Sequence, residues 1–246
     1  MDNWKYFFTY ETGIPKEAGY SFFDITHLTW MLVSFGLVAL TVLLYQKTKT
    51  ENRRKFMLTV AVILILCEVV RSGWYILLGE WTFDKSLPFE LSRIMLFIEA
   101  FAIFTNSRYL KEFTYACGLF SVAAFIAPNI FAYPIIHMHT FRYSIAHILL
   151  ITVPVIWITS DGFKPDVRYL PKISLLLFGL AGVATILNFS LEGANYMHIH
   201  YIPEHINITL GQPWFALALL GAVIGFWFLT YLPWILHERR RIKNEN

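Results

Sequence analysis

One short stretch of an otherwise apolar sequence carries side chains suited to acyl-group chemistry. Residues 85–94 read KSLPFELSRI and supply a carboxylate, a hydroxyl and a guanidinium from Glu90, Ser92 and Arg93. A serine hydroxyl attacks an acyl carbonyl when a neutral imidazole takes up its proton, and a guanidinium can hold a phosphate or a developing oxyanion. The chemistry therefore requires a histidine at the level of Ser92.

The elements that must position these residues are transmembrane helices. Of the 246 residues, 57% are hydrophobic and only 15% are charged, which is unlike an ordinary soluble domain. Several apolar runs of roughly 17 to 23 residues are long enough to cross a hydrocarbon core of about 30 Å as helices. We predict an all-α polytopic membrane bundle of seven transmembrane helices. They are residues 28–45, 56–78, 87–104, 113–131, 143–159, 173–189 and 214–236.

Basic residues predict the orientation of this bundle, because Lys and Arg are enriched in short cytoplasmic loops. Alternate connections and the C-terminal tail hold 14 of the 20 basic residues, which places the N-terminus outside and the C-terminus in the cytoplasm. The segments that hold them are residues 46–55, 105–112, 160–172 and 237–246.

The same pattern predicts three regions along the chain. Residues 1–27 form an outer interfacial segment, residues 28–236 the transmembrane domain, and residues 237–246 a basic cytoplasmic tail. A basic tail suits an anionic cytoplasmic leaflet, so the net charge of +3 does not require a nucleic-acid partner.

Depth along the predicted helices pairs Ser92 with His147. Each lies five residues from the expected outer end of its helix, or roughly 7 to 8 Å into the membrane. We therefore consider Ser92 as a nucleophile and His147 as its base. No G-x-S-x-G nucleophile elbow is present, so spacing alone gives limited support.

Other ionisable residues fall inside the predicted helices, where such side chains usually face the bundle interior. Glu68 and Arg71 are three residues apart and can pair on one helix. Glu99 lies two turns below Ser92 on the same face, and Arg142 begins the helix of His147. These residues predict one polar pocket open to the outer leaflet. The alternative is a salt-bridge network that only fixes helix packing.

Histidines near the outer face offer a second kind of chemistry. The segments HMH at 137–139 and HIH at 198–200 each present two imidazoles, and Glu90 or Glu204 could complete a zinc site. The chain contains no H-x-x-x-H pair, so a metal-dependent hydrolase is the second alternative, and we predict no metal and no cofactor.

Four motifs in order resemble segments of the bacterial YwaF family, which is related to the eukaryotic transmembrane protein 164 acyltransferases. The resemblance covers roughly the second to the seventh predicted helix. The motifs are LPFELSRI at 87–94, HTFRYSIAHILL at 139–150, GANYMHIHYIP at 193–203 and GQPWF at 211–215.

The resemblance implies transfer of a fatty acyl group through a Cys nucleophile assisted by a His. Carried over, the Cys position falls on Ser92 and the His on His147, while Glu90 replaces a motif histidine. Asn195 and Tyr196 match the family's Gly-Ser-Asn-Tyr-Met loop and are expected near the substrate. The resemblance also implies a bacterial plasma membrane protein.

The leading hypothesis is thus a lipid acyltransferase or lipid hydrolase with a Ser92–His147 dyad. The first alternative is a non-catalytic membrane protein that binds lipid in the same pocket or serves as a partner subunit. The expected partners are a membrane phospholipid or other acyl lipid and, under the alternative, another membrane protein. The residues expected to bind substrate are Arg71, Arg93, Arg142, Glu68, Glu90, Glu99, Asn195 and Tyr196.

Overall fold

The computed structural model describes residues 3–202 and 210–245, which form helices and loops without any strand. The predicted all-α class is confirmed. Five of the helices are long and apolar enough to cross a membrane. They are α1 (Ile25–Lys47), α2 (Thr50–Leu77), α6 (Met138–Ser160), α7 (Leu170–Ser190) and α8 (Trp214–Glu245).

The third predicted helix is shorter than the sequence indicated. Helix α3 (Leu91–Thr105) has 15 residues, which corresponds to about 22 Å. Pro88 disfavours helical backbone at Leu87, and the chain is still extended at Glu90, the residue before α3, at φ −68° and ψ 139°. The residues ahead of α3 therefore form a loop whose carbonyls are free to accept hydrogen bonds.

The predicted helix at residues 113–131 is interrupted. The chain forms α4 (Arg108–Phe113), a π-helical turn η4 (Thr114–Gly118) and α5 (Ser121–Ile126). Helix α5 ends because Ala127 precedes Pro128 and leaves the helical region at φ −131° and ψ 69°. Three short pieces thus stand where one membrane-spanning helix was expected.

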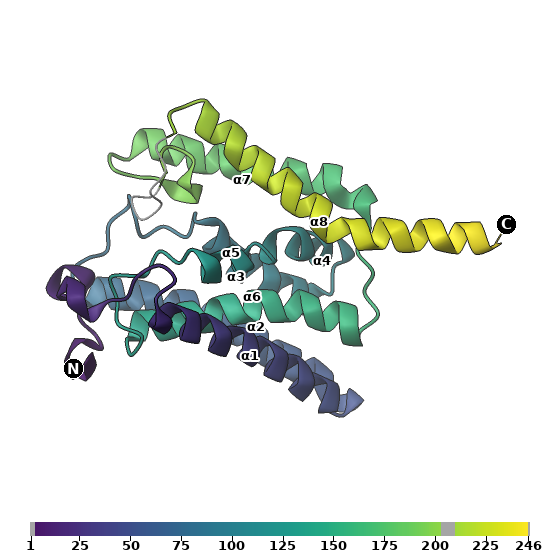
Figure 1. Ribbon diagram of the computed structural model, residues 1–246, viewed down its shortest axis with the longest axis horizontal. Coiled ribbons are helices and arrows are strands. Elements are labelled where there is room, and N and C mark those ends of the chain that lie inside the picture. The colour runs from purple at the N-terminus through teal and green to yellow at the C-terminus, as the bar shows by residue number, and fades with distance from the viewer. Residues whose placement is uncertain (1–2, 203–209, 246) are drawn as a thin grey trace.

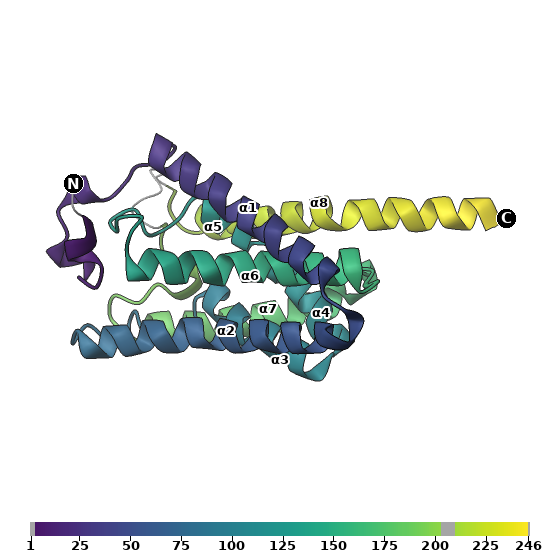
Figure 2. The ribbon, with the colours of Figure 1, turned by 90° about the horizontal axis from the view of Figure 1, so that it is seen from below.

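Helix α6 is the centre of the bundle. It packs against α1, α2, α3 and α5, and 67% of its most apolar window is buried, compared with 11% for α8. Figures 1 and 2 show α8 extending beyond the other helices at the C-terminal end, while the N-terminal residues lie at the opposite end. A peripheral apolar helix of this kind suits contact with lipid.

Helix α8 is attached through hydrogen bonds to the π-helical turn. The indole of Trp227 donates to the carbonyl of Ala116 at 3.0 Å, and the hydroxyl of Tyr115 donates to the carbonyl of Thr230 at 2.5 Å. The indole of Trp234 donates to the Tyr115 hydroxyl at 3.0 Å. The interrupted fourth segment therefore serves as the docking point of the last helix.

The N-terminal segment, residues 3–24, covers the end of the bundle at which α3 and α6 begin. It contains the 3-10 turns η1 (Asn3–Tyr6), η2 (Glu11–Gly13) and η3 (Lys16–Ala18). The indole of Trp74 donates to the Phe8 carbonyl at 3.1 Å. Gly19 passes so close to the chain that a Cβ there would lie 2.3 Å from the carbonyl oxygen of Phe131, so only glycine fits.

Candidate functional site

Glu68 of α2 is the shared acceptor of a buried ion-pair cluster. Its Oε1 accepts from Arg71 Nη2 at 2.9 Å and from Arg93 Nη2 at 2.7 Å. The two guanidiniums also donate to the carbonyl of Ser86, Arg71 at 2.6 Å. The Glu68–Arg71 pair expected from the sequence is confirmed. This arrangement ties α2, α3 and the loop between them together.

A third guanidinium, that of Arg142 on α6, faces this cluster. Arg142 is 9% exposed, interacts electrostatically with Glu68, Arg71 and Arg93, and has no hydrogen-bond partner for its Nε among the described residues. We call Arg71, Arg93 and Arg142 with Glu68 the arginine cluster. Even with the nearby carboxylate of Glu90, three positive groups face two negative ones. A buried unpaired guanidinium is costly, so the cluster has the composition of an anion site.

Ser92 immediately precedes Arg93 of this cluster in the sequence. It is the second residue of α3, and its hydroxyl makes no hydrogen bond to any residue that the structure describes. Serines further along a helix bond to the carbonyl four residues back, as Ser144 does to Thr140 at 2.8 Å. Ser92 has no helical carbonyl at that distance, because α3 has only just begun. Its hydroxyl is therefore available.

His147 lies in the middle of α6 with its ring buried. Its Nδ1 is 2.9 Å from the carbonyl oxygen of Tyr143. A carbonyl only accepts, so Nδ1 carries the proton and Nε2 keeps its lone pair. The ring packs on Tyr143 at 4.0 Å between centroids. Helices α3 and α6 are in contact, but no hydrogen bond joins Ser92 to His147 within the described chain.

The loop of Asn195 and Tyr196 covers the start of α3. The Tyr196 hydroxyl donates to the Phe83 carbonyl at 2.5 Å and accepts from the Leu87 amide at 3.1 Å. The side chain of Asn188 pairs with the backbone of Tyr196, at 3.1 Å as donor and 2.7 Å as acceptor. Sequence reasoning missed Asn188; its signal was a lone amide at the end of an apolar helix.

Glu90 and Asn195 hold other parts of this loop. Glu90 accepts from the Met197 amide at 3.2 Å and lies 3.7 Å from His198 Nε2. Asn195 accepts from the His200 amide at 3.0 Å and donates to the Tyr201 carbonyl at 2.8 Å. Both side chains thus fix the cover over the arginine cluster.

Glu99 lies deeper and apart from the arginines. It is fully buried, and neither carboxyl oxygen has a hydrogen-bond partner among the described residues. A Cβ on Gly118 would lie 3.3 Å from the Leu150 carbonyl oxygen and 3.4 Å from Glu99 Oε2, so α3, the π-helical turn and α6 meet closely here. The Leu150 carbonyl also lacks its helical donor, because Pro154 has no N–H.

The histidine segments do not form a metal site among the residues that the structure describes. No group of three or more His, Cys, Asp or Glu side chains is suitably placed there, and Glu204 lies outside the described residues. His137 instead caps α6, because its Nδ1 accepts from the His139 amide at 3.0 Å. Its Nε2–H donates to the Thr9 carbonyl at 3.0 Å.

Comparison with known proteins assigns this arrangement to a family. The model of the TMEM164 family matches residues 22–231. The chain belongs to the TMEM164 family. Searches of curated proteins and of solved structures found no match. The family match includes the whole arginine cluster, Ser92 and His147, and with the five long apolar helices it identifies a membrane protein with transmembrane helices.

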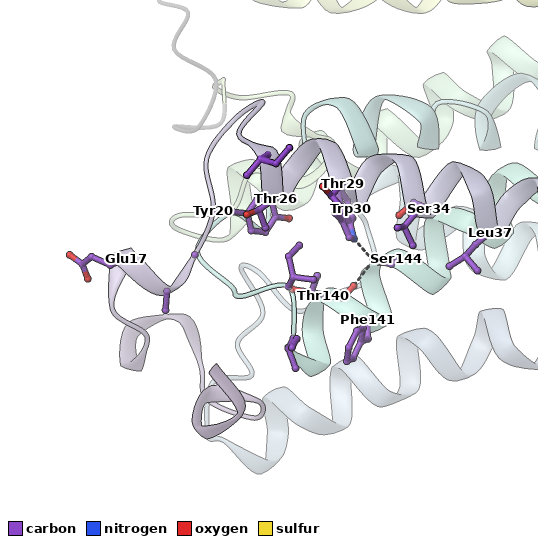
Figure 3. Close-up of a pocket in the computed structure, with 16 residues that line it drawn as sticks. Glu17, Tyr20, Thr26, Thr29, Trp30, Ser34, Leu37, Thr140, Phe141 and Ser144 are labelled. Carbon is purple, nitrogen blue, oxygen red and sulfur yellow. Dashed lines mark hydrogen bonds between the residues drawn. The ribbon is translucent and has the colours of Figure 1, made fainter. Parts of the chain in front are cut away.

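In this member of the TMEM164 family, a groove of about 750 Å³ runs between α1, α6 and the N-terminal segment. Figure 3 shows Trp30 from α1 reaching Ser144 of α6, to which its indole donates at 2.8 Å. Neither Ser92, His147 nor the arginine cluster lines this groove. The groove is therefore separate from the candidate site.

Proposed function

We propose that this protein transfers or hydrolyses the fatty acyl group of a membrane lipid, with Ser92 as nucleophile and His147 as base. The observation that carries the proposal is the Ser92 hydroxyl, which has no hydrogen-bond partner among the described residues and belongs to the residue before Arg93 of the arginine cluster. Membership of the TMEM164 family is consistent with a lipid-related membrane protein. The motif resemblance adds acyl transfer, with Ser92 at the position of the family Cys.

In the proposed reaction, Ser92 and His147 carry out the chemistry and two arginines bind the lipid. His147 Nε2 accepts the Ser92 proton as Oγ attacks the acyl carbonyl, and the resulting imidazolium returns that proton to the departing alcohol oxygen. The acyl group, now an ester of Ser92, passes to a second alcohol or to water. The guanidiniums of Arg142 and Arg93 hold the lipid phosphate. Lipid binding must bring Ser92 Oγ within about 3 Å of Nε2.

The membrane placement is part of the same proposal. The distribution of basic residues favours an outer N-terminal segment at 1–27, a seven-crossing domain at 28–236 and a cytoplasmic tail at 237–246. In this arrangement α3 and the interrupted α4–α5 segment cross within the bundle, and the arginine cluster lies in the outer half of the membrane beneath its covering loop. A member of the YwaF branch would lie in a bacterial plasma membrane.

A non-catalytic protein that binds lipid, or acts as a partner subunit, is the second candidate. It is favoured by one observation: no hydrogen bond joins Ser92 to His147 among the described residues. Binding of a lipid phosphate by the arginine cluster needs no dyad, so the two candidates differ in whether Ser92 becomes acylated.

Labelling with a lipid-like fluorophosphonate tests the proposal. The purified wild type in lipid should be labelled, and Ser92→Ala and His147→Ala should each lose labelling because the nucleophile or its base is gone. Ser144→Ala is the matched control and should keep it, since the Ser144 hydroxyl is occupied by Trp30 and Thr140. A folded wild type that stays unlabelled would sink the enzymatic proposal and leave the lipid-binding candidate.

A further inference from the structure

A second polar pocket lies at the end of the bundle opposite Ser92. It has a volume of about 340 Å³ and forms where α1, α3 and α6 end and α2 begins. Ser92 and Ile103, which lines this pocket, are separated by about 16 Å along α3. The pocket is therefore distinct from the arginine cluster, and nothing argued about it depends on acyl chemistry.

Three cations line this pocket, and none of them forms an ion pair with a described residue. Arg54 donates to the terminal carbonyls of α3, those of Ile103 at 2.5 Å and Phe104 at 2.9 Å. The guanidinium of Arg53 lies 5.2 Å from the ring centre of Tyr45, and Lys111 Nζ lies 5.2 Å from that of Trp157. Carbonyls and aromatic rings thus hold these cations in place without neutralising them.

Asp161, the one carboxylate among the described residues that line the pocket, already has a partner. The Tyr45 hydroxyl donates to Asp161, with its oxygen 2.8 and 3.0 Å from the two carboxylate oxygens. Three positive charges against one negative charge leave an excess of two. These cations repel one another across the pocket. An incoming anion would relieve this repulsion.

We propose that this pocket binds the phosphate group of an anionic ligand. Phosphate presents several acceptor oxygens and up to two negative charges, which match the excess charge of Arg53, Arg54 and Lys111, and the amide of Asn106 lies in the same wall. Basic pockets between helix ends are a known way to hold phosphorylated head groups at a membrane surface. The phosphate belongs either to a lipid head group or to a soluble phosphate compound.

Binding to the purified full-length protein in detergent tests this assignment. Calorimetric titrations would compare dihexanoyl phosphatidic acid, inorganic phosphate and dihexanoylglycerol, which lacks the phosphate. We expect Arg53→Gln and Lys111→Gln to weaken binding roughly tenfold. Asp161→Asn should tighten it, because a repelling charge is removed while an oxygen remains for Tyr45. Lys55→Gln is the matched control, since Lys55 is exposed on α2 and lies outside the pocket.

Each outcome has a defined meaning. Binding of phosphatidic acid alone that weakens in Arg53→Gln and Lys111→Gln supports the pocket and identifies a lipid head group. Equal binding of inorganic phosphate that weakens in the same variants supports the pocket and identifies a soluble ligand. The proposal is overturned if neither compound binds better than dihexanoylglycerol. It is also overturned if Lys55→Gln weakens binding as much as Lys111→Gln. The opposite sign expected for Asp161→Asn separates loss of the site from loss of the fold.

Discussion

Two buried charges in the arginine cluster have opposite roles in stability. Glu68 forms ion pairs with both Arg71 and Arg93, while Arg142 has no ion-pair partner among the described residues. Breaking a buried pair by removing one member leaves an uncompensated charge, which is more harmful than replacing a charge that was never paired. The cluster therefore combines the structural ion pairs of Glu68 with the Arg142 guanidinium, which can bind an incoming anion.

Substitution of these two residues should separate the roles. Glu68→Gln is expected to lower the free energy of unfolding by about 3 to 5 kcal/mol. Arg142→Met should leave stability unchanged or raised but weaken binding of phosphate-bearing lipid. Thermal unfolding in detergent and a lipid-binding assay measure both effects. Glu80→Gln is the control, because its pair with Lys85 is exposed and contributes at most about 1 kcal/mol. An equal loss in all three variants would contradict this division.

At these positions, sequence spacing predicted some contacts and missed others. The pairing of Glu68 with Arg71 follows from helical periodicity and is confirmed. The second acceptor, the carbonyl of Ser86, could not be predicted, because backbone groups in a loop follow no periodic pattern. Equal depth placed Ser92 and His147 at one level, but depth does not fix the direction in which a side chain points.

Helix α1 begins at a well-formed cap that offers a test at the level of a single element. The carboxylate of Asp24 accepts from the amides of His27 and Ser21, each at 2.7 Å. Asp24→Ala should therefore lower the free energy of unfolding by about 1 kcal/mol, whereas Asp24→Ser keeps a capping oxygen and should lose less. Thermal unfolding in detergent measures both variants. An Asp24→Ala variant as stable as the wild type would show that the cap contributes nothing.

Long apolar runs predicted the five long helices, but they did not predict the interruption of the fourth segment. A hydropathy pattern counts apolar residues and does not register a π-helical turn or the close approach at Gly118. Pro88 and Pro128 carried the missing information, since each disfavours helical backbone at the residue before it. Read with those prolines, the third and fourth predicted spans shorten toward the observed elements.

The attachment of the N-terminal segment to the rest of the molecule should depend on pH. His137 joins them in its neutral form, as acceptor for the His139 amide and donor to Thr9. Burial lowers the pKa of His137 below its usual value of 6.5. As pH falls below about 6.5, His137 takes up a proton in the unfolded chain before it does so in the folded protein. The free energy of unfolding that neutral His137 contributes is therefore lost toward acid pH.

Thermal unfolding between pH 7 and pH 5 measures the effect. The wild type should lose more stability over this range than His137→Asn, which retains a capping oxygen but cannot titrate. Tyr133 packs against the rings of both His137 and His139, and Tyr133 and His139 are present in both proteins. Identical pH profiles for the two proteins would exclude His137 as the titrating group.

The pairing of Glu68 with both Arg71 and Arg93 also affects how the chain inserts into a membrane. Glu68 and Arg71 are three residues apart on α2, so they can neutralise each other while that helix crosses alone. Arg93 is on the next long element and meets a counter-ion that is already in place. We therefore expect the charges of α2 to hinder its insertion little, and the insertion of α3 to depend on α2 having entered first.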